Sequence, residues 1–132
     1  MNNNATLLVV DDNKIILRFL EDLLKKHNYN VLKCISGEEA IDLLINDSPD
    51  IDLVITDYHM DQIDGLELME SIKKLDKYKK IGSILYTNVT DLPVLANKRF
   101  NIFNKVLYKT SSINSFIEEI NIILFAKVNN KK

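Results

Sequence analysis

The chain has 132 residues, of which 46% are hydrophobic, 17 are basic and 19 are acidic, giving a formal net charge of −2. This length and apolar content predict one domain over residues 1–132, with a core at about 5–127 and a tail at 128–132. The balanced charge argues against direct nucleic-acid binding, and no apolar run approaches the ~20 residues that membrane insertion requires. With no signal peptide and a single cysteine, Cys34, the sequence predicts a cytoplasmic protein without an intrachain disulfide.

Apolar runs alternate with helical patterns along the chain. Strands are expected at residues 6–10, 31–35, 51–56, 81–86 and 103–108. Helices are expected at 13–27, after a capping box at Ser36–Glu39, after Asp64-Gly65, after Thr90 or Asp91, and from Ser111 or Ser112 to about 127. A strand-helix unit repeated five times predicts a parallel sheet with helices on both faces. Right-handed crossovers then give a doubly wound (βα)5 three-layer sandwich.

The first helix carries an apolar stripe that predicts its core face. The residues of this stripe are Ile15, Ile16, Phe19, Leu20, Leu23 and Leu24. Their spacing follows the helical period, so all six are expected to face the sheet. The polar tail after the last helix is expected to fray.

Five polar side chains lie at or just after the ends of predicted strands. They are Asp11, Asp12, Asp57, Thr87 and Lys109. The carboxyl ends of parallel strands meet at one edge of an open sheet, so these side chains are expected to converge there. Three carboxylates, a hydroxyl and an ammonium suit a hard divalent cation and a phosphoryl group.

Each of these residues also has a plainer explanation. Asp11 or Asp12 could cap the first helix, and Asp57 could merely start a loop. Lys109 could be a solvated charge at a strand end. A carboxylate beside a cation can instead act as a nucleophile toward phosphorus, and the complete set favours that interpretation.

Four short motifs resemble the receiver domain of two-component response regulators. They are VVDDN at 9–13, VITDYHM at 54–60 with DG at 64–65, YTN at 86–88, and YK at 108–109. The resemblance covers about residues 5–127. It implies a flavodoxin-like, five-stranded parallel sheet of order 2-1-3-4-5.

The resemblance also implies a role for each candidate residue. Asp57 would be the phosphoacceptor, and Thr87 and Lys109 would bind the phosphoryl oxygens. Asp11, Asp12, Asp57 and the backbone carbonyl of His59 would hold Mg²⁺. A sensor histidine kinase or a phosphotransfer protein would donate the phosphoryl group to a stand-alone switch that is not an enzyme. Its output would be contact with a downstream protein that the sequence does not name, and homodimerisation stays open.

Two other functions stay open as alternatives. A pseudo-receiver would only dock partners, and the complete set of Asp12, Asp57, Thr87 and Lys109 argues against it. An aspartyl-phosphate hydrolase of the haloacid dehalogenase type would carry a second acid two residues after its nucleophile. This chain has His59 at that position, which disfavours the hydrolase.

The chain departs from the family pattern at Asp61, Val106 and Thr110. Thr110 stands where the family has a cis proline, so the Lys109–Thr110 peptide is predicted to be trans. Val106 stands at the position of the family's switch aromatic, and Tyr108 is expected on the opposite sheet face. These differences predict that the conformational change on phosphorylation is concentrated at residues 87–99, and that the surface around Val106 stays nearly static.

Overall fold

The computed structural model describes residues 5–88 and 97–130, with side chains up to residue 126. Its elements in chain order are β1 (Thr6–Val10), α1 (Lys14–Lys26), β2 (Asn30–Cys34), α2 (Gly37–Asn46), β3 (Leu53–Thr56), α3 (Gly65–Lys73), η1 (Asp76–Tyr78), β4 (Gly82–Thr87), η2 (Lys98–Ile102), β5 (Lys105–Tyr108) and α4 (Ile113–Asn130). The five predicted strands are therefore all present. The helix predicted at Thr90 or Asp91 lies outside the described residues.

The strands form one parallel sheet of order β2-β1-β3-β4-β5, which confirms the predicted topology. β1 and β3 are neighbours at its centre, and Val10 pairs with Thr56 in their register. Asp11 and Asp57 each follow one of these paired residues. The sheet order therefore brings the two aspartates side by side at the carboxyl edge.

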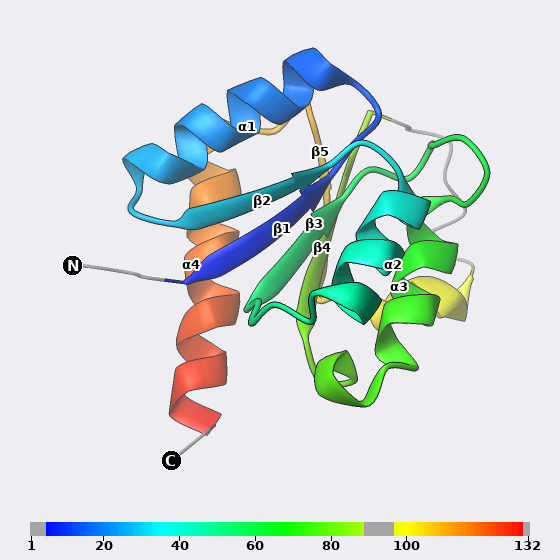
Figure 1. Cartoon of the computed structure of the whole chain (residues 1–132). Helices are drawn as coiled ribbons and strands as arrows, with labels where there is room; N and C mark the ends of the chain where they lie inside the picture. Colours follow the sequence, from blue (N-terminus) through cyan, green and yellow to red (C-terminus); the bar gives the residue numbers. More distant parts are fainter. Residues whose placement is uncertain (1–4, 89–96, 131–132) are drawn as a thin grey trace.

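Two helical layers cover the sheet (Figure 1). α1 and α4 lie against one face, while α2 and α3 lie against the other, where η2 also packs. Successive residues of β1 alternate between these faces. Leu7 and Val9 pack in the core under α1 and α4, whereas Leu8 and Val10 pack in the core under α2 and α3. Each fully buried leucine contributes roughly 1.5–3 kcal/mol to this sandwich. Within the described ranges, no helix is long and apolar enough to cross a membrane.

Two predictions about the helices were wrong. Ile15 is 80% exposed and Phe19 is 42% exposed, so neither faces the sheet. The buried face of α1 is formed by Leu20 and Leu24, as predicted, together with Leu17. The predicted Ile16 and Leu23 are partly buried against the same core. α4 continues to Asn130, so the tail predicted from residue 128 is helical as far as that residue.

The predicted face of Tyr108 was also wrong. Residues two apart in a strand share a face, so Tyr108 lies on the same side of β5 as Val106. The register agrees, because Val106 pairs with Leu85 and Tyr108 pairs with Thr87. An aromatic residue therefore sits opposite Thr87 on the face to which Val106 belongs.

Candidate phosphoacceptor site

The backbone fixes Asp11 and Asp57 one residue beyond their strands. The Asp57 amide donates to the Val10 carbonyl at 3.0 Å, and the Asp11 amide donates to the Cys34 carbonyl at 3.1 Å. The sheet ladder therefore extends to both aspartates and sets where their side chains start. This is the convergence that the sequence predicted at the carboxyl edge.

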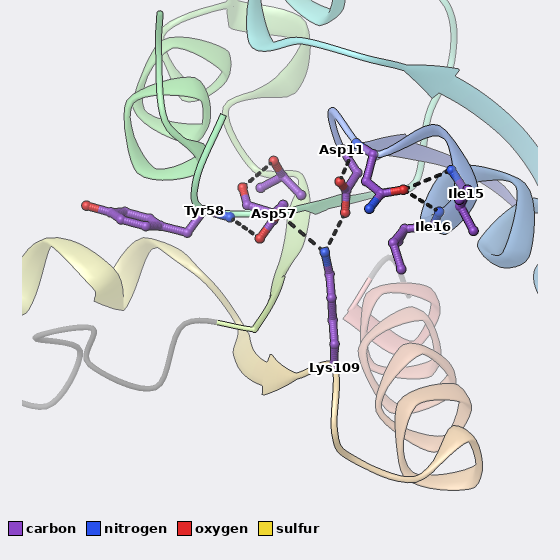
Figure 2. A network of polar contacts seen from close by, with 8 residues as sticks. Asp11, Ile15, Ile16, Asp57, Tyr58 and Lys109 are labelled. Atoms are coloured by element: carbon purple, nitrogen blue, oxygen red, sulfur yellow. Dashed lines mark hydrogen bonds and ion pairs between the residues drawn. The ribbon is translucent and has the colours of Figure 1, made fainter. Parts of the chain in front are cut away.

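Lys109 reaches from β5 to both of these aspartates (Figure 2). Its Nζ lies 2.7 Å from Asp11 Oδ2 and 3.2 Å from Asp57 Oδ2. The Lys109 amide donates to the Thr87 carbonyl at 2.8 Å. Among the residues described, no peptide is cis, so the Lys109–Thr110 bond is trans as predicted. The lysine is a buried partner of the carboxylates and not a solvated charge, since its side chain is 9% exposed.

Burial and pairing compete at this ion pair. Burial alone would lower the pKa of Lys109, but its hydrogen bond to Asp11 and the nearby Asp57 charge together raise it. Burial raises the pKa of Asp11, while Lys109 and the Asn13 amide partly offset that shift. The raised pKa of Lys109 favours a charged ion pair, whereas the raised pKa of Asp11 favours a neutral carboxyl group. The charged pair prevails, because the 2.7 Å bond satisfies both groups and Asp57 adds a second negative partner.

Asn13 caps α1, and this leaves the neighbouring aspartates available. Asn13 Oδ1 accepts from the amides of Ile15 at 2.9 Å and Ile16 at 3.2 Å. Asp11 Oδ1 in turn accepts from the Asn13 amide at 2.9 Å. The plainer explanation, in which Asp11 or Asp12 caps the helix, is therefore wrong. Asn13 was not predicted as the cap, although asparagine is a favoured capping residue.

Three carboxylates gather closely enough to hold one cation. An oxygen atom from each of Asp11, Asp12 and Asp57 lies within 4.8 Å of the other two. Asp12 is exposed and Asp57 is half-buried, so the cluster opens to solvent on one side. Hard divalent cations prefer such oxygen ligands, so these residues fit Mg²⁺.

Thr87 and His59 belong to β4 and to the loop after β3, and both of these strands lie on one side of β1. Thr87 ends β4, next to β3 in the sheet, and is fully buried. His59 is exposed in the loop after β3, where its ring meets the Tyr58 ring edge-on at 5.0 Å. Within the described residues, the carboxylate group that could hold a metal does not include the His59 imidazole. The role of its backbone carbonyl stays a prediction.

The start of α3 closes the loop against Asp57. Asp64 and Glu67 form a reciprocal capping box, with bonds of 2.8 and 2.9 Å to each other's amides. The Gly65 amide donates to the Tyr58 carbonyl at 2.8 Å. A Cβ atom at Gly65 would lie 2.1 Å from the Asp57 carbonyl oxygen. The glycine therefore allows a close backbone approach, which its place in the DG motif could have suggested.

Several known proteins are similar to parts of this chain in sequence. The chain is 35% identical over 112 residues to the CAI-1 autoinducer sensor kinase/phosphatase CqsS of Vibrio cholerae, covering 84% of this chain and 15% of CqsS. It is 35% identical over 82 residues to a chemotaxis protein CheY homolog of Campylobacter jejuni, covering 61% of this chain and 62% of that protein. The chain thus spans less than two thirds of either relative.

A solved structure agrees over nearly the whole chain. The response regulator protein TrrA of Thermotoga maritima, crystallised in complex with Mg²⁺-BeF, has a TM-score of 0.80 and 28% sequence identity. The match covers 90% of this chain and 98% of TrrA. Residues 7–121 also match the response regulator receiver domain as a family. The chain therefore belongs to the response regulator receiver domain family of two-component signalling.

Proposed function

We propose that the chain is a phosphorylation-dependent signalling switch whose phosphoacceptor is Asp57. The observation that carries this proposal is the contact of Lys109 Nζ with Asp57 Oδ2 at 3.2 Å, inside a cluster of three carboxylates. A carboxylate next to a fixed ammonium can approach a phosphoryl group, since the cation offsets the repulsion between the two anions. Residues 1–132 would act as one receiver unit.

The donor would be a phosphohistidine on a sensor histidine kinase or a phosphotransfer protein. A carboxylate oxygen of Asp57 attacks phosphorus, a P–O bond forms, and the P–N bond to the donor breaks. The electron pair of that bond leaves with the donor imidazole, and the product is an acyl phosphate on Asp57. Lys109, with Thr87 on the neighbouring strand, would bind the phosphoryl oxygens. CqsS is named a sensor kinase/phosphatase, which supports a kinase partner.

The carboxylates of Asp11, Asp12 and Asp57 and the backbone carbonyl of His59 would hold Mg²⁺. When bound, the ion neutralises negative charge that develops between the phosphoryl group and the carboxylates. The close grouping of the three carboxylates supports this assignment. The Mg²⁺-BeF complex of TrrA supports it as well, because that relative has the same fold.

The surface next to the site suits contact with a protein donor. Ile15 and Phe19 are exposed on α1, which begins directly after the aspartates. Lys14 and Arg18 lie beside them and line the same shallow apolar surface. We infer that a donor protein contacts this part of α1 while its phosphohistidine reaches Asp57.

Intact-mass spectrometry tests the proposed acceptor. The wild-type chain, incubated with acetyl phosphate and Mg²⁺, is expected to gain the mass of one phosphoryl group. Asp57→Ala should lose that adduct, whereas Asp61→Ala, at an exposed aspartate four residues further on, should keep it. An adduct that persists in Asp57→Ala would overturn the proposal.

A further inference from the structure

The carbonyl oxygen of Asp57 has two close neighbours, the Thr56 hydroxyl and the backbone of Gly65. The Thr56 hydroxyl donates to it at 2.9 Å. Gly65 also lies so close to this oxygen that a Cβ atom at Gly65 would be 2.1 Å from it. β3 ends at Thr56, so this carbonyl lies beyond the last strand residue. The two contacts therefore fix a backbone group at the point where the chain leaves the sheet.

Fixing this carbonyl also fixes the amide on the other side of the same peptide. The Asp57–Tyr58 peptide is planar, so the direction of its C=O sets the direction of its N–H. That Tyr58 N–H donates to Asp57 Oδ1 at 2.7 Å. The Thr56 hydroxyl is thus connected to the Asp57 carboxylate through one rigid peptide. In Figure 2 this amide faces the carboxylate, while the Tyr58 ring points away from the cluster.

Packing alone does not explain a threonine at this position. The other residues of β3 are Leu53, Val54 and Ile55, and all of them are buried. Thr56 is also completely buried, and it pairs with Val10 and Leu85 on the neighbouring strands. Valine has nearly the same shape and the same preference for strands, and it would bury no polar atom. The hydroxyl therefore acts through the bond that it makes.

We propose that Thr56 is a positioning residue for the phosphoacceptor and acts through the Asp57–Tyr58 peptide. This inference rests on the proposed function of Asp57. The hydroxyl keeps the Tyr58 amide directed at Asp57 Oδ1. This bond fixes the orientation of the Asp57 carboxylate while its Oδ2 contacts Lys109. The same peptide leads toward His59, so its orientation also affects the predicted carbonyl ligand for Mg²⁺.

Three variants of the full chain separate positioning from packing. Thr56→Val removes the hydroxyl, and Thr56→Ser keeps it in a smaller side chain. Ser83→Ala is the matched control, because Ser83 is also fully buried on a strand and its hydroxyl donates to the Ile102 carbonyl at 3.3 Å. That bond lies between β4 and η2, away from the carboxylate cluster.

Two measurements are made on each variant. The first is the rate of phosphorylation by acetyl phosphate at saturating Mg²⁺. We expect a roughly tenfold loss in Thr56→Val, since even a small misplacement of a reacting group is costly. The second is the amide proton shift of Tyr58 in the metal-free protein, which reports the bond to Asp57 directly. It should move upfield in Thr56→Val, while Thr56→Ser and Ser83→Ala stay close to wild type in both measurements.

The outcomes distinguish this role from the proposed function. A wild-type chain that accepts no phosphoryl group on Asp57 would overturn the function and this role with it. A Thr56→Val chain that is phosphorylated at the wild-type rate would overturn this role alone, whatever its Tyr58 shift. Equal losses in Thr56→Val and Ser83→Ala would also overturn it, because they would reflect general destabilisation.

Discussion

At the scale of single residues, the three clustered aspartates differ in how they are held. The Asp11 side chain is 3% exposed and is paired with Lys109, and the Asp57 side chain is 12% exposed. Asp12 is exposed, and its carboxylate adds negative charge next to the other two. Clustered carboxylates repel one another until a cation binds. Asp12 is therefore suited to binding a metal and contributes little to holding the fold.

Asp12→Ala is predicted to weaken Mg²⁺ binding without damaging the fold. A lost carboxylate ligand should reduce Mg²⁺ affinity by at least about 10- to 100-fold, the range seen for changes just outside a metal's ligand shell. Without metal, the free energy of unfolding should stay within about 0.5 kcal/mol of wild type or rise, because a like charge is removed. Thermal melts with and without Mg²⁺ measure both effects. Strong destabilisation in the metal-free melt would contradict this view of Asp12.

Cys34 is predicted to be chemically inert in the folded chain. Burial, reinforced by the neighbouring Glu39, raises the pKa of its thiol from 9.0 to about 12. Between these two values the folded state keeps the proton while the unfolded state ionises. This group's contribution to stability is therefore complete below pH 9.0 and is lost progressively as the pH rises from 9.0 to about 12. At pH 8 a thiol reagent should react slowly with the native chain and quickly in urea. Equally fast reaction in both conditions would show that the thiol is accessible.

At the scale of elements, the start of α3 decides how the loop after β3 lies. The capping box fixes the first turn, and Gly65 brings that turn against the Asp57 carbonyl. Gly37 in α2 has a different kind of neighbour, because a Cβ atom there would meet the end of the Ile63 side chain at 2.5 Å. A side-chain end can rotate away, whereas a backbone carbonyl has to move with its chain.

Gly65→Ala is therefore predicted to be more harmful than Gly37→Ala. The added methyl group should displace the Asp57 backbone and cost about 1–3 kcal/mol of stability, as overpacking does elsewhere. Gly37→Ala should stay within about 1 kcal/mol of wild type, because alanine's higher helix propensity offsets the rotation of Ile63. Urea unfolding measures both variants, and phosphorylation should slow only in Gly65→Ala. The reverse order of stabilities would refute this comparison.

Helix α1 marks a limit of prediction from sequence. The hydrophobic period predicts that a helix forms, but six apolar residues around Ile15 and Leu24 span more of the surface than the sheet can cover. Which of them are buried depends on how the helix lies on the sheet, and that is set by tertiary packing. The cap was missed for a related reason: three adjacent polar residues, Asp11, Asp12 and Asn13, all suit the role. Only the bonds from the Ile15 and Ile16 amides identify Asn13 as the cap.

At the scale of the whole molecule, the topology was predictable because it depends only on the order of elements. Alternating strands and helices lead to one parallel sheet, and a parallel sheet gathers its carboxyl ends at one edge. The contacts across that edge were not predictable in detail. The bonds of Lys109 to Asp11 and of Thr56 to the Asp57 carbonyl depend on side-chain directions that no local pattern encodes. The face of Tyr108 was predictable from the strand period, but the predicted face was wrong.

The register of β5 changes the predicted route of the response. Val106 is small and stiff, so it has little movement to offer. Tyr108 lies opposite Thr87, and we now expect the response of β5 to centre on Tyr108. Amide shifts with and without beryllofluoride and Mg²⁺ should be large at Thr87, Asn88 and Tyr108 and small at Val106, with Asp57→Ala as the unresponsive control. Shifts at Val106 that equal those at Tyr108 would rule out this route.

The bond between Lys109 and Asp11 also has a consequence for the order of assembly. It joins residues 98 positions apart, from an edge strand to a central one. A chain made from its N-terminus presents all three aspartates long before the last strand emerges from the ribosome, and closing so long a loop carries an entropic cost. Until β5 docks, Asp11 and Asp57 lack the Lys109 ammonium that contacts them in the folded chain. The proposed phosphoacceptor site is therefore complete only once β5 has joined the sheet, and a partly made chain that lacks Lys109 would accept a phosphoryl group poorly.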